Sequence, residues 1–316
     1  MGYWLLGLHV SMWSMSEQKP KIVVIVGPTA SGKSDLAVIL AKQFQGEVVS
    51  ADSRQVYRGL DIGSGKVTKK EMGGIPHHML DIASPKRTYT VAQFKRDGDK
   101  AIQQILKRGH LPIICGGTGF YVDALAFDMQ FPDVKPNFAL RKQLEKKSVD
   151  ELYTQLEEMD PRRAEMIDKH NPVRLIRAIE IATVYGKVAP LVTSSRYDIC
   201  WIGIAVDGEK LKERIQLRIT KRMRQGMVKE FEGLRAGGLS LRRMEMLGLE
   251  YRFGARLISG ALTKTEFTEQ LRNEIVKYAK RQLTWFKKNK EIHWIPQGDS
   301  AGAIAHAGKF LGQKDK

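Results

Sequence analysis

The chain has 316 residues, of which 42% are hydrophobic and 28% charged, so it can bury a substantial core in one large domain or in a core domain with a smaller partner. Its 52 lysines and arginines against 35 aspartates and glutamates give a net charge of +17, which favours a polyanionic partner such as nucleic acid over a merely basic enzyme. Two isolated cysteines, Cys115 and Cys200, argue against a disulfide framework or a zinc site and predict a reducing, cytoplasmic compartment.

Residues 1–19 are expected to form a disordered N-terminal extension. The first part, MGYWLLGLHVSMWSM, is apolar but lacks a basic leading segment and a small-residue cleavage site, so it makes a poor signal peptide. It is also too short to span a bilayer, and no membrane association is expected. Met12 and Met15 are alternative starts.

A phosphate-binding loop is predicted next. KIVVIV at 21–26 is a continuous β-branched run, typical of a strand buried on both faces of a parallel sheet. GPTASGKS at 27–34 follows at once and fits G-x-x-x-x-G-K-[ST], and KSDLAVILAKQF at 33–44 has helical apolar spacing. In this order, backbone N–H groups at the helix start can bind a di- or triphosphate, Lys33 adds charge, and Ser34 is the expected Mg²⁺ ligand. The residues expected to hold the phosphates are Gly27, Pro28, Thr29, Ala30, Ser31, Gly32, Lys33 and Ser34.

Two further strands are predicted, GEVVSAD at 46–52 and LPIICGG at 111–117, with a crossover helix at 90–109 between them. Parallel strands joined in this way present their carboxyl ends at one edge of the sheet. The loops after Val26, Ser50 and Cys115 are therefore expected to converge on one site.

The character of the sequence changes at about residue 132, where strand signals stop and charged helical segments punctuated by proline begin. DICWIGIAV at 198–206 predicts a return to the sheet, and long basic helices are expected at 208–238 and 264–289. We therefore predict an α/β fold: a P-loop NTPase-like parallel sheet flanked by helices (20–131 and 199–316) with a mostly helical insertion domain (132–198).

Asp52 ends the second predicted strand and is open to two interpretations from the residues alone. In a nucleotide kinase, an acidic residue at this point supports Mg²⁺. It could instead be a helix cap or turn residue. The phosphate loop does not decide between these, because its pattern does not specify a nucleotide.

Several longer motifs follow the phosphate loop in order, and they narrow the possibilities. They are SADSRQVYRGLDIGSGK (50–66), PHHMLDI (76–82), YTVAQFKRDGDKAI (89–102), GGTGFYVDAL (116–125), NPVRLIRAIE (171–180), RIQLRITKRMRQGMVKEF (214–231) and YAKRQLTWF (278–286). Together with GPTASGKSDLA, these segments resemble the tRNA dimethylallyltransferases, also called tRNA isopentenyl-pyrophosphate transferases, over roughly residues 20–295.

The resemblance implies that dimethylallyl diphosphate alkylates N6 of the adenine 3′ of the anticodon in tRNA, with diphosphate released and Mg²⁺ as cofactor. In such a reaction the phosphate loop holds the diphosphate, and Arg218 is placed to contact it, with Arg214 and Arg222 as weaker candidates. Asp52 corresponds to the base that accepts the amine proton, because adenine N6 is a poor nucleophile. Thr118 is the expected contact to the target base.

The resemblance also implies tRNA contacts in three segments, because the adenine must be flipped out of the anticodon loop. The residues carried over are Asp52, Ser53, Arg54 and Gln55, then Val173, Arg174, Leu175, Ile176 and Arg177 on the insertion, and Gly248. The third segment departs from the family, which usually has Gly-Tyr and a basic residue where this chain has Gly248, Leu249 and Glu250. Tyr251 and Arg252 are candidates to supply the missing groups.

Two alternatives to tRNA prenylation are an adenylate isopentenyltransferase acting on free AMP, ADP or ATP, and a small-molecule or nucleotide kinase. The helical insertion and the charge of +17 favour RNA, because a free nucleotide needs neither. We expect a monomer. For the aromatic and basic segment at 278–294, packing of the aromatic side chains on the core is favoured over an RNA-stacking platform.

Overall fold

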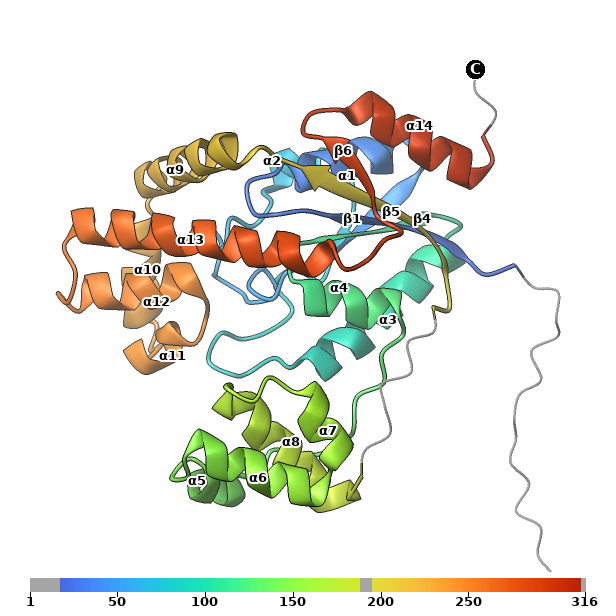
Figure 1. The fold of residues 1–316 in the computed structure, drawn as a ribbon. Helices are drawn as coiled ribbons and strands as arrows, with labels where there is room; N and C mark the ends of the chain where they lie inside the picture. Colours follow the sequence, from blue (N-terminus) through green and yellow to red (C-terminus); the bar gives the residue numbers. More distant parts are fainter. Residues whose placement is uncertain (1–17, 188–194, 314–316) are drawn as a thin grey trace, which may run out of the picture. The chain divides into compact units, whose positions relative to one another are not determined.

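The computed structural model describes residues 18–187 and 195–313 and divides the chain into two compact units (Figure 1). One unit runs to Asp128 and resumes at Ser195, and the other comprises Met129–Ser194. The insertion predicted at 132–198 differs from the second unit by a few residues at each end. The predicted extension at 1–19 lies outside the described residues except for its last two positions.

A parallel six-stranded sheet forms the centre of the first unit, in the order β3-β2-β4-β1-β5-β6. The strands are β1 (Lys21–Val26), β2 (Gly46–Ser50), β3 (His77–His78), β4 (Leu111–Gly116), β5 (Asp198–Ala205) and β6 (His293–Pro296). The predicted strands at 21–26, 46–52, 111–117 and 198–206 are confirmed as β1, β2, β4 and β5. The sequence analysis missed β3 and β6, because two- and four-residue strands at the sheet edges carry too little periodicity to be recognised.

The helices of the first unit either cover the two faces of this sheet or pack against other helices beside it. They are α1 (Lys33–Gln43), α2 (Lys69–Met72), α3 (Val91–Lys107), α4 (Gly119–Ala126), α9 (Gly208–Arg224), α10 (Met227–Ala236), α11 (Leu241–Glu245), α12 (Leu249–Ile258), α13 (Lys264–Phe286) and α14 (Ser300–Leu311). The prediction of one helix at 208–238 is wrong, because this segment forms two helices, α9 and α10. Gly226, between them, has a left-handed φ of 98°, which ends the helical hydrogen bonding of α9. In the described part of the chain, no helix is long and apolar enough to cross a membrane.

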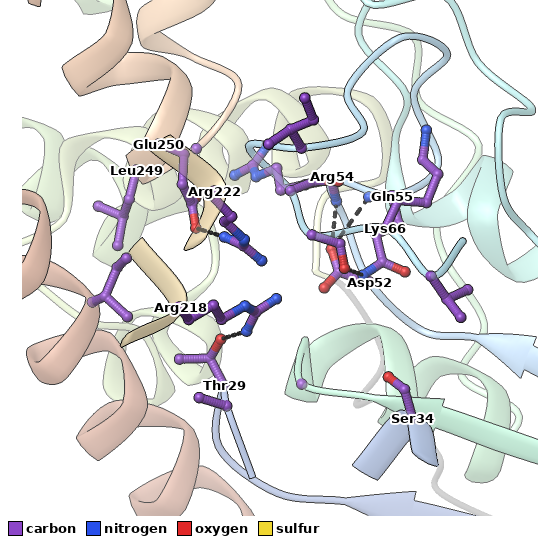
Figure 2. A pocket seen from close by; sticks show the side chains of 18 of the residues that line it. Thr29, Ser34, Asp52, Arg54, Gln55, Lys66, Arg218, Arg222, Leu249 and Glu250 are labelled. Atoms are coloured by element: carbon purple, nitrogen blue, oxygen red, sulfur yellow. Dashed lines mark hydrogen bonds and ion pairs between the residues drawn. The ribbon is translucent and has the colours of Figure 1, made fainter. Parts of the chain in front are cut away.

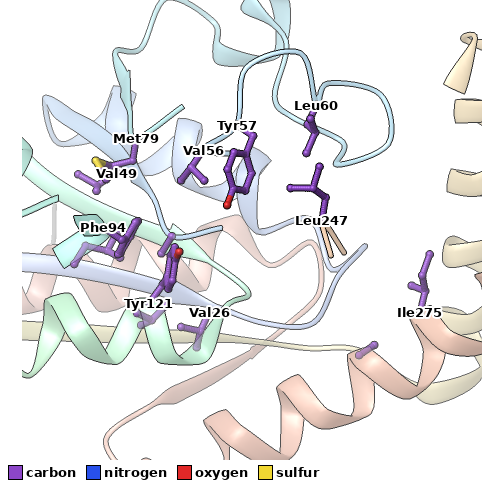
Figure 3. Close-up of a cluster of buried hydrophobic side chains, with 14 of the residues drawn as sticks. Val26, Val49, Val56, Tyr57, Leu60, Met79, Phe94, Tyr121, Leu247 and Ile275 are labelled. Atoms are coloured by element: carbon purple, nitrogen blue, oxygen red, sulfur yellow. The ribbon is translucent and has the colours of Figure 1, made fainter. Parts of the chain in front are cut away.

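Alternate side chains of β1 enter two different apolar cores. Val24 and Val26 pack with residues of α3, α4 and α13 on one face, whereas Val23 and Ile25 pack with α1 and α14 on the other. In the first core the rings of Phe94 and Tyr121 stack with centroids 3.9 Å apart (Figure 3). Strand β1 is covered on both faces and paired on both sides. Its carboxyl end is therefore the part that can border a ligand site.

The second unit is helical, as predicted, and consists of α5 (Phe138–Leu144), α6 (Val149–Met159), α7 (Pro161–Met166) and α8 (Pro172–Tyr185). Each of these helices begins at a side chain that accepts a backbone N–H, namely Asn137, Ser148, Asp160 and Asn171. Glu180 is buried at its centre, where it pairs with Arg141 and Arg177 and accepts the Asn137 N–H at 2.6 Å. The unit therefore has its own core.

Glu47 on β2 is a second buried carboxylate, held between β2, β3 and the residues that follow α3. Arg108 donates from Nε and Nη2 at 2.8 Å each, and His78 Nε2 and His110 Nδ1 lie 2.6 and 2.7 Å from its oxygens. The hydrogen bonds from Arg108 are the main reason that the pKa of Glu47 falls from 4.5 to about 2.

Because this pKa is lowered on folding, ionised Glu47 stabilises the protein fully above pH 4.5, and that contribution is lost as the pH falls toward 2. We predict that Glu47→Gln lowers the free energy of unfolding by about 2 kcal/mol at neutral pH. Urea denaturation between pH 3 and pH 7 would measure this, with the exposed Glu269→Gln as control. Glu47→Gln should show a flatter pH dependence than the wild type below pH 4.5; parallel curves would contradict this assignment.

Candidate active site

A cavity of about 1120 Å³ lies at the carboxyl ends of β1, β2 and β4 in the first unit (Figure 2). The loops after these strands contribute Lys33, Asp52 and Gly117, and helices α9, α12 and α13 supply most of the remaining wall. The prediction that three strand-end loops converge on one site is therefore confirmed. The neighbouring positions of β1, β2 and β4 in the sheet explain it.

The phosphate loop has the backbone that its glycines permit. Gly32 has a φ of 89° and directly precedes α1, so the first N–H groups of that helix lie at the cavity. A Cβ at Gly27 would lie only 2.9 Å from Ser31 Oγ, which is itself buried without a hydrogen-bond partner among the described residues. Thr29, Ala30, Gly32, Lys33 and Ser34 line the cavity, whereas Gly27, Pro28 and Ser31 support the loop from behind.

Three cationic side chains meet beside this loop. Lys33 donates from Nζ to Pro28 O at 3.0 Å, and Arg218 donates from Nη1 to Thr29 Oγ1 at 2.7 Å. Desolvation lowers the pKa of Lys33 and Arg222, and burial together with the nearby Arg222 lowers that of Arg218 to about 10. Like charges held this close in a dehydrated site favour an anionic ligand. Arg218 is thus not the solvated helix residue that its basic surroundings alone would suggest.

Arg222 was a weaker candidate from the sequence, but it is the most buried of the three, with 5% of its surface exposed. Its Nη1 donates to Gly63 O at 2.9 Å and lies 3.4 Å from Glu250 Oε1. Its Nη2 has no hydrogen-bond partner in the described ranges. Arg214 is exposed and donates from Nε to Ala30 O at 2.9 Å.

A loop at residues 61–65 lies against buried Arg222 and half-buried Arg218. Glu230 holds this loop by accepting the N–H groups of Asp61, Ile62 and Gly63 at 3.0, 2.6 and 2.9 Å. Gly65 has a φ of 62°, and a Cβ there would lie 1.6 Å from Arg222 Nη2 and 2.3 Å from Arg218 Nη2. The glycine in DIGSGK therefore lets the backbone approach the guanidinium groups.

Tyr251 does not supply the group that the third tRNA-contacting segment lacks. It is fully buried, donates to Glu230 Oε1 at 2.8 Å and accepts the Ser64 N–H at 3.1 Å. The helix that carries it turns Tyr251 inward and leaves Arg252 exposed at the cavity. Of the two candidates, only Arg252 is placed to reach a ligand.

Asp52 faces the cavity with one carboxylate oxygen already engaged. Oδ1 accepts the N–H of Arg54 at 2.8 Å and of Gln55 at 3.3 Å, which orients the side chain (Figure 2). The other oxygen has no hydrogen-bond partner within the part of the chain that is described. Asp52 is therefore a pre-oriented carboxylate with one oxygen available to a ligand.

Thr118 lies behind Asp52 instead of in the cavity wall. It takes the N-cap position of α4, but its side chain makes no capping bond to the described backbone of that helix. Instead, Thr118 Oγ1 accepts the Ser53 N–H at 3.1 Å. The cavity-lining residues include Gly117 and not Thr118. In this structure Thr118 contacts the loop that carries Asp52, and its contact with a target base stays a prediction.

Gly248 and Arg54, both predicted to bind tRNA, contact each other. Gly248 precedes α12 with a φ of 113°, and a Cβ there would lie 2.7 Å from Arg54 Nε. Arg54 also donates to Met246 O at 3.5 Å. Ser53 and Gln55 line the same part of the cavity. The absence of a side chain at Gly248 thus leaves room for the Arg54 side chain in this position.

The second unit separates the five residues predicted on α8. Val173 and Arg174 are exposed, whereas Leu175 and Ile176 are buried in the core of that unit and Arg177 is bound to Glu180 and to Val134 O. The predicted tRNA contact is corrected for the side chains of Leu175 and Ile176, because they lie on the face of α8 that packs on the core and are not exposed to a ligand.

The Mg²⁺ predicted at Ser34 fits the residues around it. The Ser34 hydroxyl lines the cavity with two carboxylates, Asp35 and Asp52. Mg²⁺ is commonly bound by one or two protein oxygens, with phosphate oxygens and water completing the octahedron. No cluster of three or more His, Cys, Asp or Glu side chains suited to a metal occurs among the described residues. The site therefore suits a metal that binds together with a phosphate ligand.

The close approach at Gly65 can be tested directly. Gly65→Ala should weaken the binding of Mg²⁺-diphosphate about tenfold or more, because it displaces a guanidinium group worth one charge-assisted hydrogen bond. Gly74→Ala is the matched control: its φ of 83° imposes similar backbone strain, but its Cβ would meet no described atom within 4 Å. Isothermal titration would measure both, and equal affinities would contradict the role of Gly65.

Known proteins match this chain over most of its length. The family model for IPP transferase matches residues 55–289, and that for isopentenyl transferase matches residues 20–88. The tRNA dimethylallyltransferase of Anoxybacillus flavithermus is 41% identical over 285 residues, covering 88% of this chain and 91% of the relative.

Solved structures of similar proteins also match this chain. The full-length tRNA isopentenylpyrophosphate transferase of Bacillus halodurans is 34% identical with a TM-score of 0.70, covering 94% of this chain and 98% of that one. A eukaryotic dimethylallyltransferase, captured in crystallographic snapshots acting on tRNA, has a TM-score of 0.78 over 94% of this chain and 80% of its own; at 24% identity this likeness shows the fold alone. The predicted P-loop NTPase-like fold is confirmed. The chain belongs to the IPP transferase family, the tRNA dimethylallyltransferases.

Proposed function

We propose that this enzyme transfers a dimethylallyl group from dimethylallyl diphosphate to N6 of the adenine 3′ of the anticodon in tRNA and releases diphosphate. The observation that carries the proposal is the composition of the cavity: Arg218 and Arg222 point into it from one side, and the carboxylate of Asp52 lies on the other (Figure 2). A leaving anion and a proton acceptor are the two needs of this reaction.

The cationic side holds the diphosphate. When the allylic C–O bond breaks, negative charge grows on the diphosphate oxygens, and preorganised donors stabilise that charge most where water is excluded. Lys33, Arg218 and the N–H groups at the start of α1 serve this purpose, with Arg222 as a further guanidinium. Mg²⁺, held by Ser34, would neutralise charge on the same oxygens.

Asp52 acts on the nucleophile. The N6 lone pair is delocalised into the adenine ring, so removal of a proton as the N–C bond forms assists the attack. The free oxygen of Asp52 accepts that proton, while the Arg54 and Gln55 N–H groups hold the other oxygen in place. The new bond joins N6 to the allylic carbon, and diphosphate leaves with the electrons of the broken C–O bond.

A tRNA acceptor is supported by the arginine residues in the cavity wall and by family membership. Arg54, Arg252 and Arg281 line the cavity, and Tyr278 offers an aromatic ring beside them. Unpaired bases are commonly bound in this way, by stacking and by contacts to the surrounding phosphates. Exposed Val173 and Arg174 give the helical unit a surface for the same RNA.

We further propose that the enzyme is a monomer that works in the cytoplasm.

The acceptor can be identified in one assay. Labelled dimethylallyl diphosphate with Mg²⁺ is supplied with an unmodified tRNA transcript that has adenine 3′ of the anticodon, with the same transcript carrying guanine there, with free AMP, or with ATP. We expect label only in the adenine transcript. Label confined to AMP would establish an adenylate prenyltransferase, and ATP turnover without prenyl transfer would establish a kinase.

Replacement of the proposed base separates chemistry from binding. Asp52→Asn keeps an oxygen for the Arg54 N–H but cannot accept a proton, so kcat should fall by about 10²- to 10⁴-fold while tRNA affinity changes little. Asp198→Asn, at the opposite end of the sheet, should behave as the wild type. Steady-state kinetics and a tRNA filter-binding assay would decide; a large loss of tRNA affinity with unchanged kcat contradicts the assignment.

A further inference from the structure

Gln282 on α13 joins two loops of the active site. Only 6% of its surface is exposed. Its Oε1 accepts the N–H of Thr29 in the phosphate loop at 2.9 Å, and its Nε2 donates to Gly117 O, at the end of β4, at 2.7 Å. One side-chain amide therefore bridges the loop that holds the leaving group and the turn that supports the loop of the base.

The bridge continues at both ends. Beyond Thr29, its hydroxyl accepts from Arg218 Nη1 at 2.7 Å, and beyond Gly117, Thr118 Oγ1 accepts from Ser53 N at 3.1 Å. Ser53 is the neighbour of Asp52 in the chain. A single series of hydrogen bonds and one peptide unit thus connects the diphosphate-binding arginine to the backbone next to the base.

The surrounding packing holds Gln282 in this position. A Cβ at Gly117 would lie 2.3 Å from Gln282 Nε2, so a glycine is needed for the amide to reach the carbonyl. On the same face of α13, Trp285 Nε1 donates to Asp123 Oδ2, on α4, at 2.8 Å. Residues 282 and 285 have the spacing of one helix face, so α13 is attached at two neighbouring points, to the turn after β4 and to α4.

We propose that Gln282 is a positioning residue that sets the separation between the allylic carbon, held through its diphosphate, and the adenine N6 beside Asp52. This inference rests on the proposed prenyl transfer. Gln282 exchanges no proton and breaks no bond; it acts through Thr29 and Gly117. Reacting atoms must approach to roughly 3–3.5 Å, and a misplacement of about 1 Å can slow a reaction about 10²-fold without loss of substrate binding.

The test uses Gln282→Met, which keeps the shape of the side chain but removes both hydrogen bonds. We expect kcat to fall about 10- to 100-fold, with the Kd of dimethylallyl diphosphate and the KM of tRNA within about threefold of the wild type. Gln270→Met is the matched control, because it makes the same change at an exposed position of the same helix. Thermal unfolding of each variant confirms that it is folded.

Two results overturn the proposal while prenyl transfer by the wild type stands: a kcat within threefold of the wild type, or a loss that lies wholly in donor affinity. A wild-type protein that does not prenylate tRNA refutes the proposed function instead. If Gln282→Met does not fold, Gly117→Ala tests the same bridge, because its Cβ displaces the Gln282 amide and little else. The same fall in kcat is expected there, and unchanged kcat in a folded Gly117→Ala contradicts the role of Gln282.

A double-mutant cycle distinguishes positioning along one chain of contacts from separate local effects. Thr118→Val removes the acceptor for the Ser53 N–H at the far end of the bridge. If the contacts act as one unit, the kcat of Gln282→Met combined with Thr118→Val should be close to that of the slower single variant. Losses that multiply would show that the two residues act independently and would overturn the proposed bridge.

Discussion

The active site depends on keeping several positive side chains partly out of water before any ligand arrives. Lys33, Arg218 and Arg222 lie beside one another at the edge of the sheet, and desolvation lowers the pKa of each. Burial of a charge is costly unless hydrogen bonds replace those to water. Here the acceptors are oxygens of loops: Pro28 O, Thr29 Oγ1 and Gly63 O. The loops therefore supply acceptors for the cationic side chains as well as N–H groups for a phosphate.

The burial of these cations explains why side chains from the second half of the chain hydrogen-bond to loops from the first half. Glu230 on α10 gathers the N–H groups of residues 61–63, and Gln282 on α13 accepts the N–H of Thr29. Gln297, just after β6, donates to Ser31 O at 2.9 Å. Contacts of such long sequence separation give loops the rigidity that electrostatic stabilisation of a transition state requires. The active-site loops thus depend on side chains of the second half of the chain for their conformation.

Local patterns were sufficient for much of the architecture. The β-branched run at 21–26, the glycine pattern at 27–34 and the helical spacing after it each reflect neighbouring residues, and the structure reproduces all three. Short edge strands and the break between α9 and α10 were missed, because they depend on pairing and on a left-handed glycine, Gly226, that periodicity does not register. The same limit applies to α8, where pattern and family likeness together did not separate exposed Val173 from buried Leu175.

The sequence by itself determined the fold class, the phosphate loop and the family, because these follow from contiguous motifs whose spacing is set by strand and helix geometry. Only the tertiary structure decided that Arg222 joins Arg218 at the cavity, that Tyr251 is turned inward to Glu230, that Thr118 supports the Asp52 loop, and that Gln282 bridges two loops. The physical reason is that a hydrogen bond between residues 165 or 253 positions apart, as Gln282 makes to Gly117 and to Thr29, leaves no periodic trace along the chain.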